Sequence, residues 1–149
     1  MARQRFGRGQ TLPKRERVSR VMRGNKGKDT RPEIALRHAL RDSGIKGYRI
    51  HWKGAPGRPD IAFPGRKVAI FVHGCFWHRC PYCKLPIPKS NRAFWLAKFK
   101  RNKERDGRYI QSLDTLGWGH LIVWECEVNK DAERVVRRIK KILDSSDVK

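Results

Sequence analysis

Acidic residues are scarce in this chain of 149 residues, where 14 Asp and Glu stand against 36 Lys and Arg and leave a formal net charge of +22. Such an excess indicates a polyanionic partner, either nucleic acid or an anionic membrane surface. Long apolar runs are also missing: no stretch reaches the roughly 18 residues of a membrane span, and no apolar signal region follows the basic N-terminus. We therefore expect a soluble intracellular protein.

The composition predicts one folded domain preceded by a basic arm. Hydrophobic residues make up 38% of the chain, which is enough to bury a core. Residues 1–28 carry ten basic side chains and one acid, so we expect a flexible arm there and the folded domain over residues 29–149. The arm either contacts phosphates and orders on binding, or is only a solvated tail.

The spacing of apolar residues predicts the element order α, β, β, β, α, β, α. Thr30 and Glu33 form a capping box at the start of a helix that ends at Gly44. Strands are predicted over residues 48–52, 60–63, 67–72 and 118–124, and further helices over 91–116 and 131–143. The continuous apolar run at 67–72 predicts a central strand buried on both faces, and 121–123 a second buried strand. The fold class is therefore α/β.

Asp60 is the only acidic residue among fourteen Lys and Arg between residues 43 and 103. It follows a Gly-Arg-Pro turn and immediately precedes an apolar strand. A carboxylate at the mouth of a sheet in a positive field suits a hard cation, and phosphodiester cleavage needs such a cation near the scissile phosphate. Asp60 is thus the leading candidate ligand for magnesium. Alternatively, it only closes the turn or pairs with Arg58.

Two histidines, His73 and His78, follow the predicted central strand in the segment HGCFWH. Open α/β sheets usually place their chemistry at the carboxyl ends of strands. If the strand that carries Asp60 neighbours the strand that ends at Val72, both imidazoles and the Val72 carbonyl can converge on one metal ion or its water. One histidine would then activate water and the other assist the leaving oxygen. A structural hydrogen-bonding role is the alternative for either histidine.

Four cysteines, Cys75, Cys80, Cys83 and Cys126, have a spacing typical of a zinc site. The first three form the pattern C-x4-C-x2-C, and the fourth ends the last predicted strand. Four thiolates allow a closed tetrahedral site, so the zinc would be structural and the hydrolytic ion a different one. A redox pair of Cys80 and Cys83, or unrelated free thiols, are the alternatives.

Five short segments carry a family resemblance when they are taken together. They are GRPD at 57–60, FVHGCFWH at 71–78, FWL at 94–96, NKERD at 102–106 and LIVWEC at 121–126. This set resembles the very-short-patch mismatch repair endonucleases over about residues 17–128. The resemblance implies a restriction-endonuclease-like fold of the PD-(D/E)xK type, with a mixed central sheet flanked by helices. It also implies nicking of one DNA strand on the 5′ side of the thymine in a T:G mismatch, the lesion left when 5-methylcytosine deaminates.

The resemblance also assigns roles to individual residues. Asp60 and the backbone carbonyl of Val72 would hold two magnesium ions. The catalytic residues would be Asp60, His73, His78, Glu33 and Asp106. The zinc ligands would be Cys75, Cys80, Cys83 and Cys126. Phe76, Trp77 and Trp95 would form an aromatic wedge that enters DNA beside the mismatch. The acid-x-lysine part of the usual nuclease motif is absent, so histidine would do the work of lysine.

Some of these residues also have simpler, purely structural explanations. Glu33 also fits as the capping-box partner of Thr30, and the two roles can coexist. Asp106 lies in a run of charges where ion pairing along a helix is ordinary, and Trp95 on an amphipathic helix suits a core position.

The resemblance further implies a prokaryotic-type cytoplasmic protein that is associated with the nucleoid. It would act as a monomer on double-stranded DNA, without a membrane partner and with a functional link to a cytosine methyltransferase. Two rival functions remain. One is a restriction-type endonuclease that cuts both strands of paired DNA, and the other is a zinc-stabilised DNA-binding module without catalysis.

Overall fold

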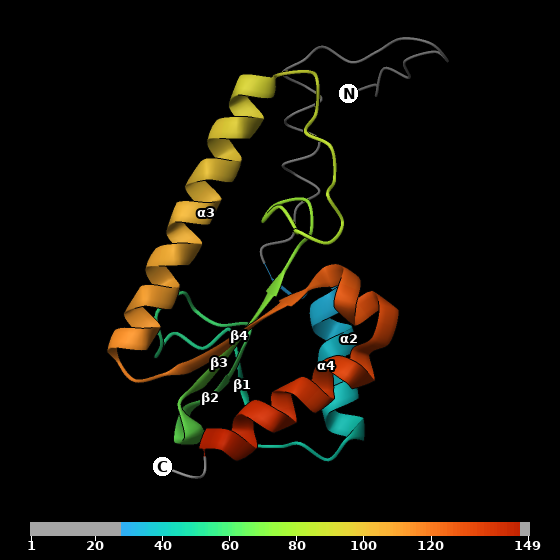
Figure 1. The fold of residues 1–149 in the computed structure, drawn as a ribbon. Coiled ribbons are helices and arrows are strands. Elements are labelled where there is room, and N and C mark those ends of the chain that lie inside the picture. Colours follow the sequence, from blue (N-terminus) through green and yellow to red (C-terminus); the bar gives the residue numbers. More distant parts are fainter. Residues whose placement is uncertain (1–27, 147–149) are drawn as a thin grey trace, which may run out of the picture.

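A computed structural model describes residues 28–146 of the chain, which form one mixed sheet with helices on both faces (Figure 1). The strands are β1 (Arg49–Ile50), β2 (Ile61–Phe63), β3 (Val68–His73) and β4 (Gly119–Trp124), in the order β1-β2-β3-β4. The first two pairings are antiparallel and the β3–β4 pairing is parallel. This confirms the α/β class and the predicted element order. The predicted basic arm lies outside the described residues, apart from Lys28.

The helices form two layers around the sheet. Helices α2 (Arg31–Asp42) and α4 (Glu125–Ser146) pack together on one face, and α3 (Arg92–Thr115) lies on the other (Figure 1). A short 3-10 helix, η1 (Pro64–Arg66), joins β2 to β3. None of the described helices is both long and apolar enough to cross a membrane.

The first helix begins where the capping box predicts. The Thr30 hydroxyl accepts a hydrogen bond from the Glu33 N–H (3.5 Å) and donates one to Glu33 Oε1 (3.1 Å). The first of these bonds satisfies an N–H at the helix start that would otherwise have no partner. Together the two bonds fix the Glu33 side chain at the end of α2 that lies nearest the cleft described below.

Two buried clusters follow from the alternation of side chains along β3. Val68 and Ile70 face the larger cluster, which is shared with α2 and α4. Ala69 and Phe71 face a smaller cluster that includes Leu113 of α3. Because side chains two residues apart share a face, His73 continues the second series and points to the side of α3.

The last strand and helix differ from the prediction. β4 is an edge strand, and of its residues only Val123 is fully buried. Helix α4 begins six residues before the predicted start, and its backbone leaves the helical conformation at Asp131 (φ −160°, ψ 86°). There Asp131 Oδ1 accepts a hydrogen bond from the Arg134 N–H (3.0 Å), so the predicted start is the cap of the second part of α4. Cys126 lies in the part of α4 before Asp131, which the sequence pattern did not predict as helix.

Candidate active site

A cleft of about 1820 Å³ opens at the carboxyl end of β3. All the predicted catalytic residues line it, together with a histidine that sequence reasoning missed: Glu33, His51, Asp60, His73, His78 and Asp106. They come from both faces of the sheet, because Glu33 is on α2 and Asp106 on α3. The condition set for their convergence is met, because β2 and β3 pair with each other and bring the Asp60 and His73 segments together.

Asp60 is fixed against the adjacent strand. Its Oδ2 accepts a hydrogen bond from the backbone N–H of Val72 (2.7 Å). Burial raises the pKa of Asp60 to about 6, and the nearby Glu33 carboxylate acts in the same direction. An ionised carboxylate has about four acceptor positions, of which this bond uses one. The oxygen donors of Asp60 therefore suit a hard cation, whose charge would offset the cost of burial.

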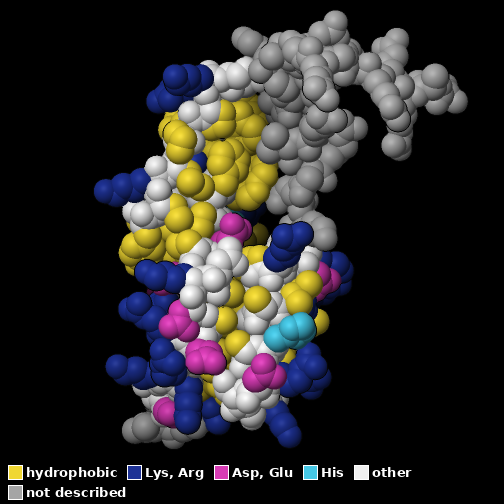
Figure 2. All heavy atoms as spheres, turned by 90° about the vertical axis from the view of Figure 1, so that its right-hand side faces the viewer, with side chains coloured by type: hydrophobic (Ala, Val, Ile, Leu, Met, Phe, Trp, Pro, Cys, Tyr) yellow, Lys and Arg dark blue, Asp and Glu magenta, His cyan; other side chains and the backbone are white. Residues whose placement is uncertain are grey.

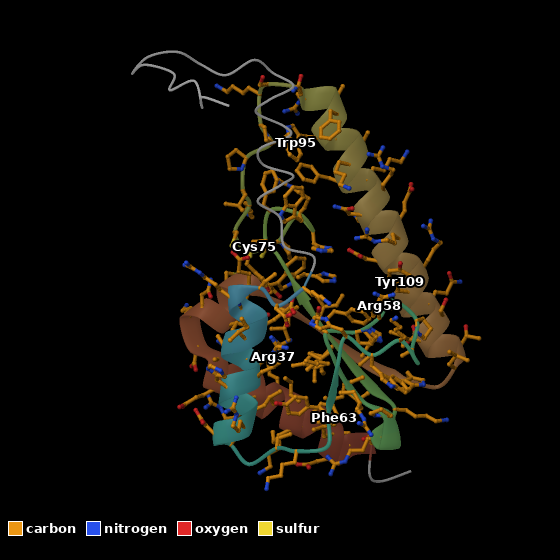
Figure 3. All side chains as sticks on the ribbon, turned by 180° about the vertical axis from the view of Figure 1, so that it is seen from behind. Arg37, Arg58, Phe63, Cys75, Trp95 and Tyr109 are labelled. Carbon is orange, nitrogen blue, oxygen red and sulfur yellow. The ribbon has the colours of Figure 1, made fainter. Side chains whose placement is uncertain are left out.

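The loop before Asp60 is packed closely against α3. Gly57 has a φ of +80°, and a Cβ there would approach the Tyr109 ring to 2.9 Å, so only glycine fits without a shift. Figure 3 shows the neighbouring Arg58 and Tyr109 close together on this side of the molecule. The positive φ of Gly57, which residues with a side chain rarely adopt, thus lets the GRPD segment place Asp60 at the cleft.

His73 and His78 stack on each other, with ring centroids 3.9 Å apart and an interplanar angle of 12°. His78 Nδ1 lies 2.5 Å from Asp106 Oδ2. Burial acts to raise the pKa of Asp106, but the hydrogen bond with His78 outweighs it and lowers that pKa. An ionised carboxylate only accepts, so Nδ1 of His78 carries the proton. Burial, together with the neighbouring His78, lowers the pKa of His73 to about 4, so His73 is neutral at pH 7.

Glu33 contacts both the helix cap and a side chain of the cleft. It is part of the capping box, and its Oε2 also lies 3.6 Å from His51 Nε2, in a side chain that is only 7% exposed. The cap therefore does not compete with a role in the cleft. The same Oε2 accepts a hydrogen bond from the Asp29 N–H (3.0 Å).

Basic side chains from several elements surround these groups. The cleft is also lined by Lys28, Arg31, Lys53, Arg58, Lys98 and Arg105. Lysine and arginine at the edge of a cleft neutralise the phosphates of a nucleic acid backbone. The net charge thus has a local counterpart around the candidate active site.

The four cysteines also converge. Their Sγ atoms lie within 4.8 Å of one another, and Cys80 Sγ is 3.8 Å from Cys126 Sγ. A tetrahedral site with Zn–S bonds of about 2.3 Å has sulfur atoms about 3.8 Å apart, so the cluster has the size of a zinc site. Burial acts against ionisation of the Cys80 thiol, but the N–H groups of Cys83 and Tyr82 lower its pKa. Such a thiol is ready to serve as a thiolate ligand.

Comparison with known proteins identifies the family. The model of the family DNA mismatch endonuclease Vsr matches residues 11–84. The Type II nicking enzyme V.XorIIP of Xanthomonas oryzae pv. oryzae is 41% identical over 88% of this chain and 95% of its own length. The DNA mismatch endonuclease Vsr of Escherichia coli is also 41% identical, over 72% of this chain and 69% of its own. The chain belongs to the Vsr family. It is a DNA-nicking endonuclease of mismatch repair, and DNA is its partner.

Five aromatic residues of this Vsr-family protein form a cluster between the β3–α3 loop and the start of α3: Phe76, Trp77, Phe94, Trp95 and Phe99. Phe76 packs edge-on against Trp77, Trp95 and Phe99, with centroids 5.1–5.3 Å apart. Phe76 and Trp77 line the cleft, whereas Trp95 is 3% exposed and stacks on Phe99. Entry of Trp95 into DNA would require it to leave this packing. Its role in the wedge stays a prediction.

Apolar side chains also reach the surface in this part of the Vsr-family protein. Figure 2 shows them gathered over the half of the molecule that contains the start of α3. The exposed ones are Tyr82, Leu85, Phe94 and Leu96. This surface adjoins the cleft through Phe76 and Trp77, because Phe94 contacts Trp95, which in turn contacts Trp77.

Two positioning residues of the loop were missed by sequence reasoning. Asn102 is 5% exposed and its Nδ2 donates a hydrogen bond to the Trp77 carbonyl (3.0 Å). The Arg79 guanidinium lies 4.5 Å from the centroid of the Phe99 ring and donates a hydrogen bond to the Leu85 carbonyl. Asn102 belongs to the NKERD segment, which was the only sequence signal for it. Nothing in the sequence distinguished Arg79 from the other basic residues.

Proposed function

We propose that this protein nicks one strand of duplex DNA on the 5′ side of the thymine in a T:G mismatch, by magnesium-dependent hydrolysis of the phosphodiester. The observation that carries the proposal is the convergence of Asp60, the two stacked histidines and Asp106 in one cleft with a basic rim. A cation ligand, proton-transfer groups and phosphate-binding side chains are the parts that phosphodiester hydrolysis needs.

Asp60 and the Val72 carbonyl would hold two magnesium ions, whose chemistry is to polarise the scissile phosphate and lower the pKa of water. The hydrogen bond from the Val72 N–H keeps the Asp60 carboxylate at the end of β3. Glu33, at the start of α2, completes the acidic side of the cleft. The basic side chains around the cleft bind phosphates on either side of the cleavage point.

The two histidines are suited to opposite proton transfers. His73 is neutral at pH 7 and accepts a proton from the attacking water. The ring of His78 is held in place by Asp106 at Nδ1, which leaves Nε2 to donate a proton to the leaving oxygen. This division follows from their different partners: His73 is buried beside Trp124, whereas His78 contacts a carboxylate.

Several finer features belong to the same proposal. The element order and mixed sheet support a restriction-endonuclease-like fold of the PD-(D/E)xK type, and the cysteine cluster supports a structural zinc ion. A monomer suffices, because one cleft carries one set of catalytic groups and one strand is cut. A cytoplasmic, nucleoid-associated location and a link to a cytosine methyltransferase are consistent with repair of deaminated 5-methylcytosine.

The substrate is tested with duplexes that are identical except at one position, which carries T:G, U:G or C:G. We expect nicking of the T:G duplex in magnesium and none in chelator. The C:G duplex tests the restriction-type alternative, since equal nicking of paired DNA would overturn the mismatch assignment. The fragment length in a denaturing gel gives the cleavage position, and cleavage on the 3′ side of the thymine would contradict the proposal.

The aromatic wedge gives a separate prediction. Trp77→Ala should lower nicking of the T:G duplex by about tenfold to a hundredfold, because base–aromatic stacking contributes roughly 1–3 kcal/mol per base. The matched control is Tyr82→Ala, which removes an aromatic ring that is 70% exposed in the same loop. Single-turnover nicking by both variants measures the effect. Equal losses in the two variants would contradict a wedge at Trp77.

A further inference from the structure

His51 lies in the cleft beside Asp60, although none of the segments that identify the family contains it. It follows β1, and its backbone N–H donates a hydrogen bond to the Asp60 carbonyl (3.2 Å). Its φ is +47°, in the left-handed region that costs a residue with a side chain about 1 kcal/mol or more. The surrounding structure thus holds His51 in an unfavourable conformation next to a candidate metal ligand.

The imidazole of His51 lies between two carboxylates. Its Nε2 is 3.3 Å from Asp29 Oδ1 and 3.6 Å from Glu33 Oε2, and the side chain is 18% exposed. A nitrogen that carries a proton at this place attracts both oxygens. His51 therefore links Asp29, which precedes the N-cap Thr30, to the buried Glu33 of α2.

Asp29 is itself held in place from two sides. Its Oδ1 accepts a hydrogen bond from the Arg37 guanidinium (2.8 Å), and its backbone N–H donates to Glu33 Oε2 (3.0 Å). The contacts with Arg37 and then His51 lower the pKa of Asp29, so it is ionised at neutral pH. Asp29 is therefore a fixed acceptor that sets the orientation of the His51 ring.

We propose that His51 is a positioning residue of the active site, whose imidazole is anchored by Asp29 and holds the Glu33 carboxylate toward the Asp60 side of the cleft. The proposal rests on the proposed function, because it takes Glu33 to act in the reaction. Glu33 and Asp60 repel each other when both are ionised, and the His51 imidazole, 3.6 Å from Glu33 Oε2, opposes that repulsion. Without His51, Glu33 keeps its bonds to Thr30 and Asp29 but loses its contact on the cleft side.

The test compares His51→Ala and His51→Gln with the wild type on whichever duplex the wild type cuts best. We expect His51→Ala to lower kcat by about tenfold to a hundredfold, the size that small misplacements of catalytic groups produce. It should also raise the magnesium concentration needed for half-maximal nicking. His51→Gln keeps a donor and should recover most of the rate. Nicking by His51→Ala within twofold of the wild type would overturn the proposal.

A double-mutant cycle with Glu33→Gln separates positioning from general destabilisation. If His51 acts through Glu33, His51→Ala should have almost no further effect on kcat in the Glu33→Gln background. If the double variant instead lowers kcat by the product of the two separate factors, His51 does not act through Glu33. The matched control is His120→Ala, since His120 Nδ1 lies 3.5 Å from Asp114 Oδ1 in a His–Asp pair outside the cleft. It should nick at the wild-type rate.

A measurement that does not depend on catalysis tests the contact between His51 and Glu33 directly. In ¹⁵N-histidine-labelled protein, Glu33→Gln should shift the imidazole nitrogen signals of His51 and leave those of His120 unchanged. Unchanged His51 signals would overturn the contact, whatever the substrate. If the wild type instead shows no preference for T:G, the proposed substrate fails while the His51–Glu33 coupling is still measured on the duplex that is cut.

Discussion

Replacing Asp60 by asparagine is expected to lower magnesium-dependent nicking by about a thousandfold while DNA binding is retained. Asparagine has nearly the same shape, and its amide oxygen can still accept the hydrogen bond from the Val72 N–H. What it lacks is the negative charge that, in the proposed mechanism, would hold a hard cation beside the scissile phosphate. Loss of one preorganised electrostatic group in a catalytic site costs about a hundredfold to a thousandfold in rate.

The same substitution should stabilise the metal-free protein at neutral pH. Burial raises the pKa of Asp60 from 3.8 to about 6, so the ionised carboxylate opposes folding by up to about 3 kcal/mol above pH 6. This penalty decreases as the pH falls from 6 and vanishes below about pH 4, where Asp60 is protonated in both states. Asp60→Asn removes the penalty. A variant that is inactive but more stable at pH 8 cannot owe its inactivity to unfolding.

Single-turnover nicking and chemical denaturation in chelator measure the two effects, and a gel-shift assay measures DNA binding. Asp114→Asn is the matched control, because it makes the same chemical change in a carboxylate that is 63% exposed and outside the cleft. The control should match the wild type in activity. Nicking by Asp60→Asn at the wild-type rate would remove Asp60 from the reaction and favour a cation held elsewhere.

Much of this arrangement could be predicted because local signals agreed with the global fold. The capping box at Thr30 and Glu33 fixed the start of α2, and the continuous apolar run of β3 marked an inner strand. The isolation of Asp60 in a basic background pointed to a functional carboxylate. Once β2 and β3 pair, the connection of Asp60 with the histidines follows from the register alone.

The remaining features depend on contacts between residues far apart in the sequence. His51 meets Asp29 and Glu33 only because the chain turns at a positive φ, which no residue pattern announces. The first turn of α4 was missed because its start lacks the Ser, Thr, Asp or Asn cap that Asp131 supplies to the second part. Its Glu127 side chain instead reaches back to accept a hydrogen bond from the Trp124 N–H (2.9 Å).

If zinc occupies the cysteine cluster as proposed, its removal is expected to lower the thermal stability of the protein more than any single substitution in the cleft. The four cysteines join the β3–α3 loop to the first turn of α4, and that loop carries His78, Phe76 and Trp77. Structural zinc sites contribute about 10–16 kcal/mol in small domains. Even a third of that value corresponds to a Tm lower by roughly 10 °C in a chain of this size.

The pH dependence of zinc binding has a definite sign. Burial raises the pKa of the Cys75 thiol, and it raises the pKa of Cys126 to about 11, so these groups are protonated in the metal-free protein at pH 7. Zinc binds the thiolates and must displace those protons. Zinc affinity should therefore increase from pH 6 to pH 8, which competition with a coloured chelator measures.

Metal analysis of the purified protein should find one zinc per chain, and the thiols should react with a thiol reagent only after chelation. Cys126→Ser should lose zinc and nicking together, because the loop that carries His78 is then attached to the sheet at one end only. Asp60→Asn is the control: it loses nicking but keeps zinc and the thermal transition of the zinc-bound form. Less than about half an equivalent of zinc, with an unchanged Tm in chelator, would show that the thiols hold the loop by packing alone.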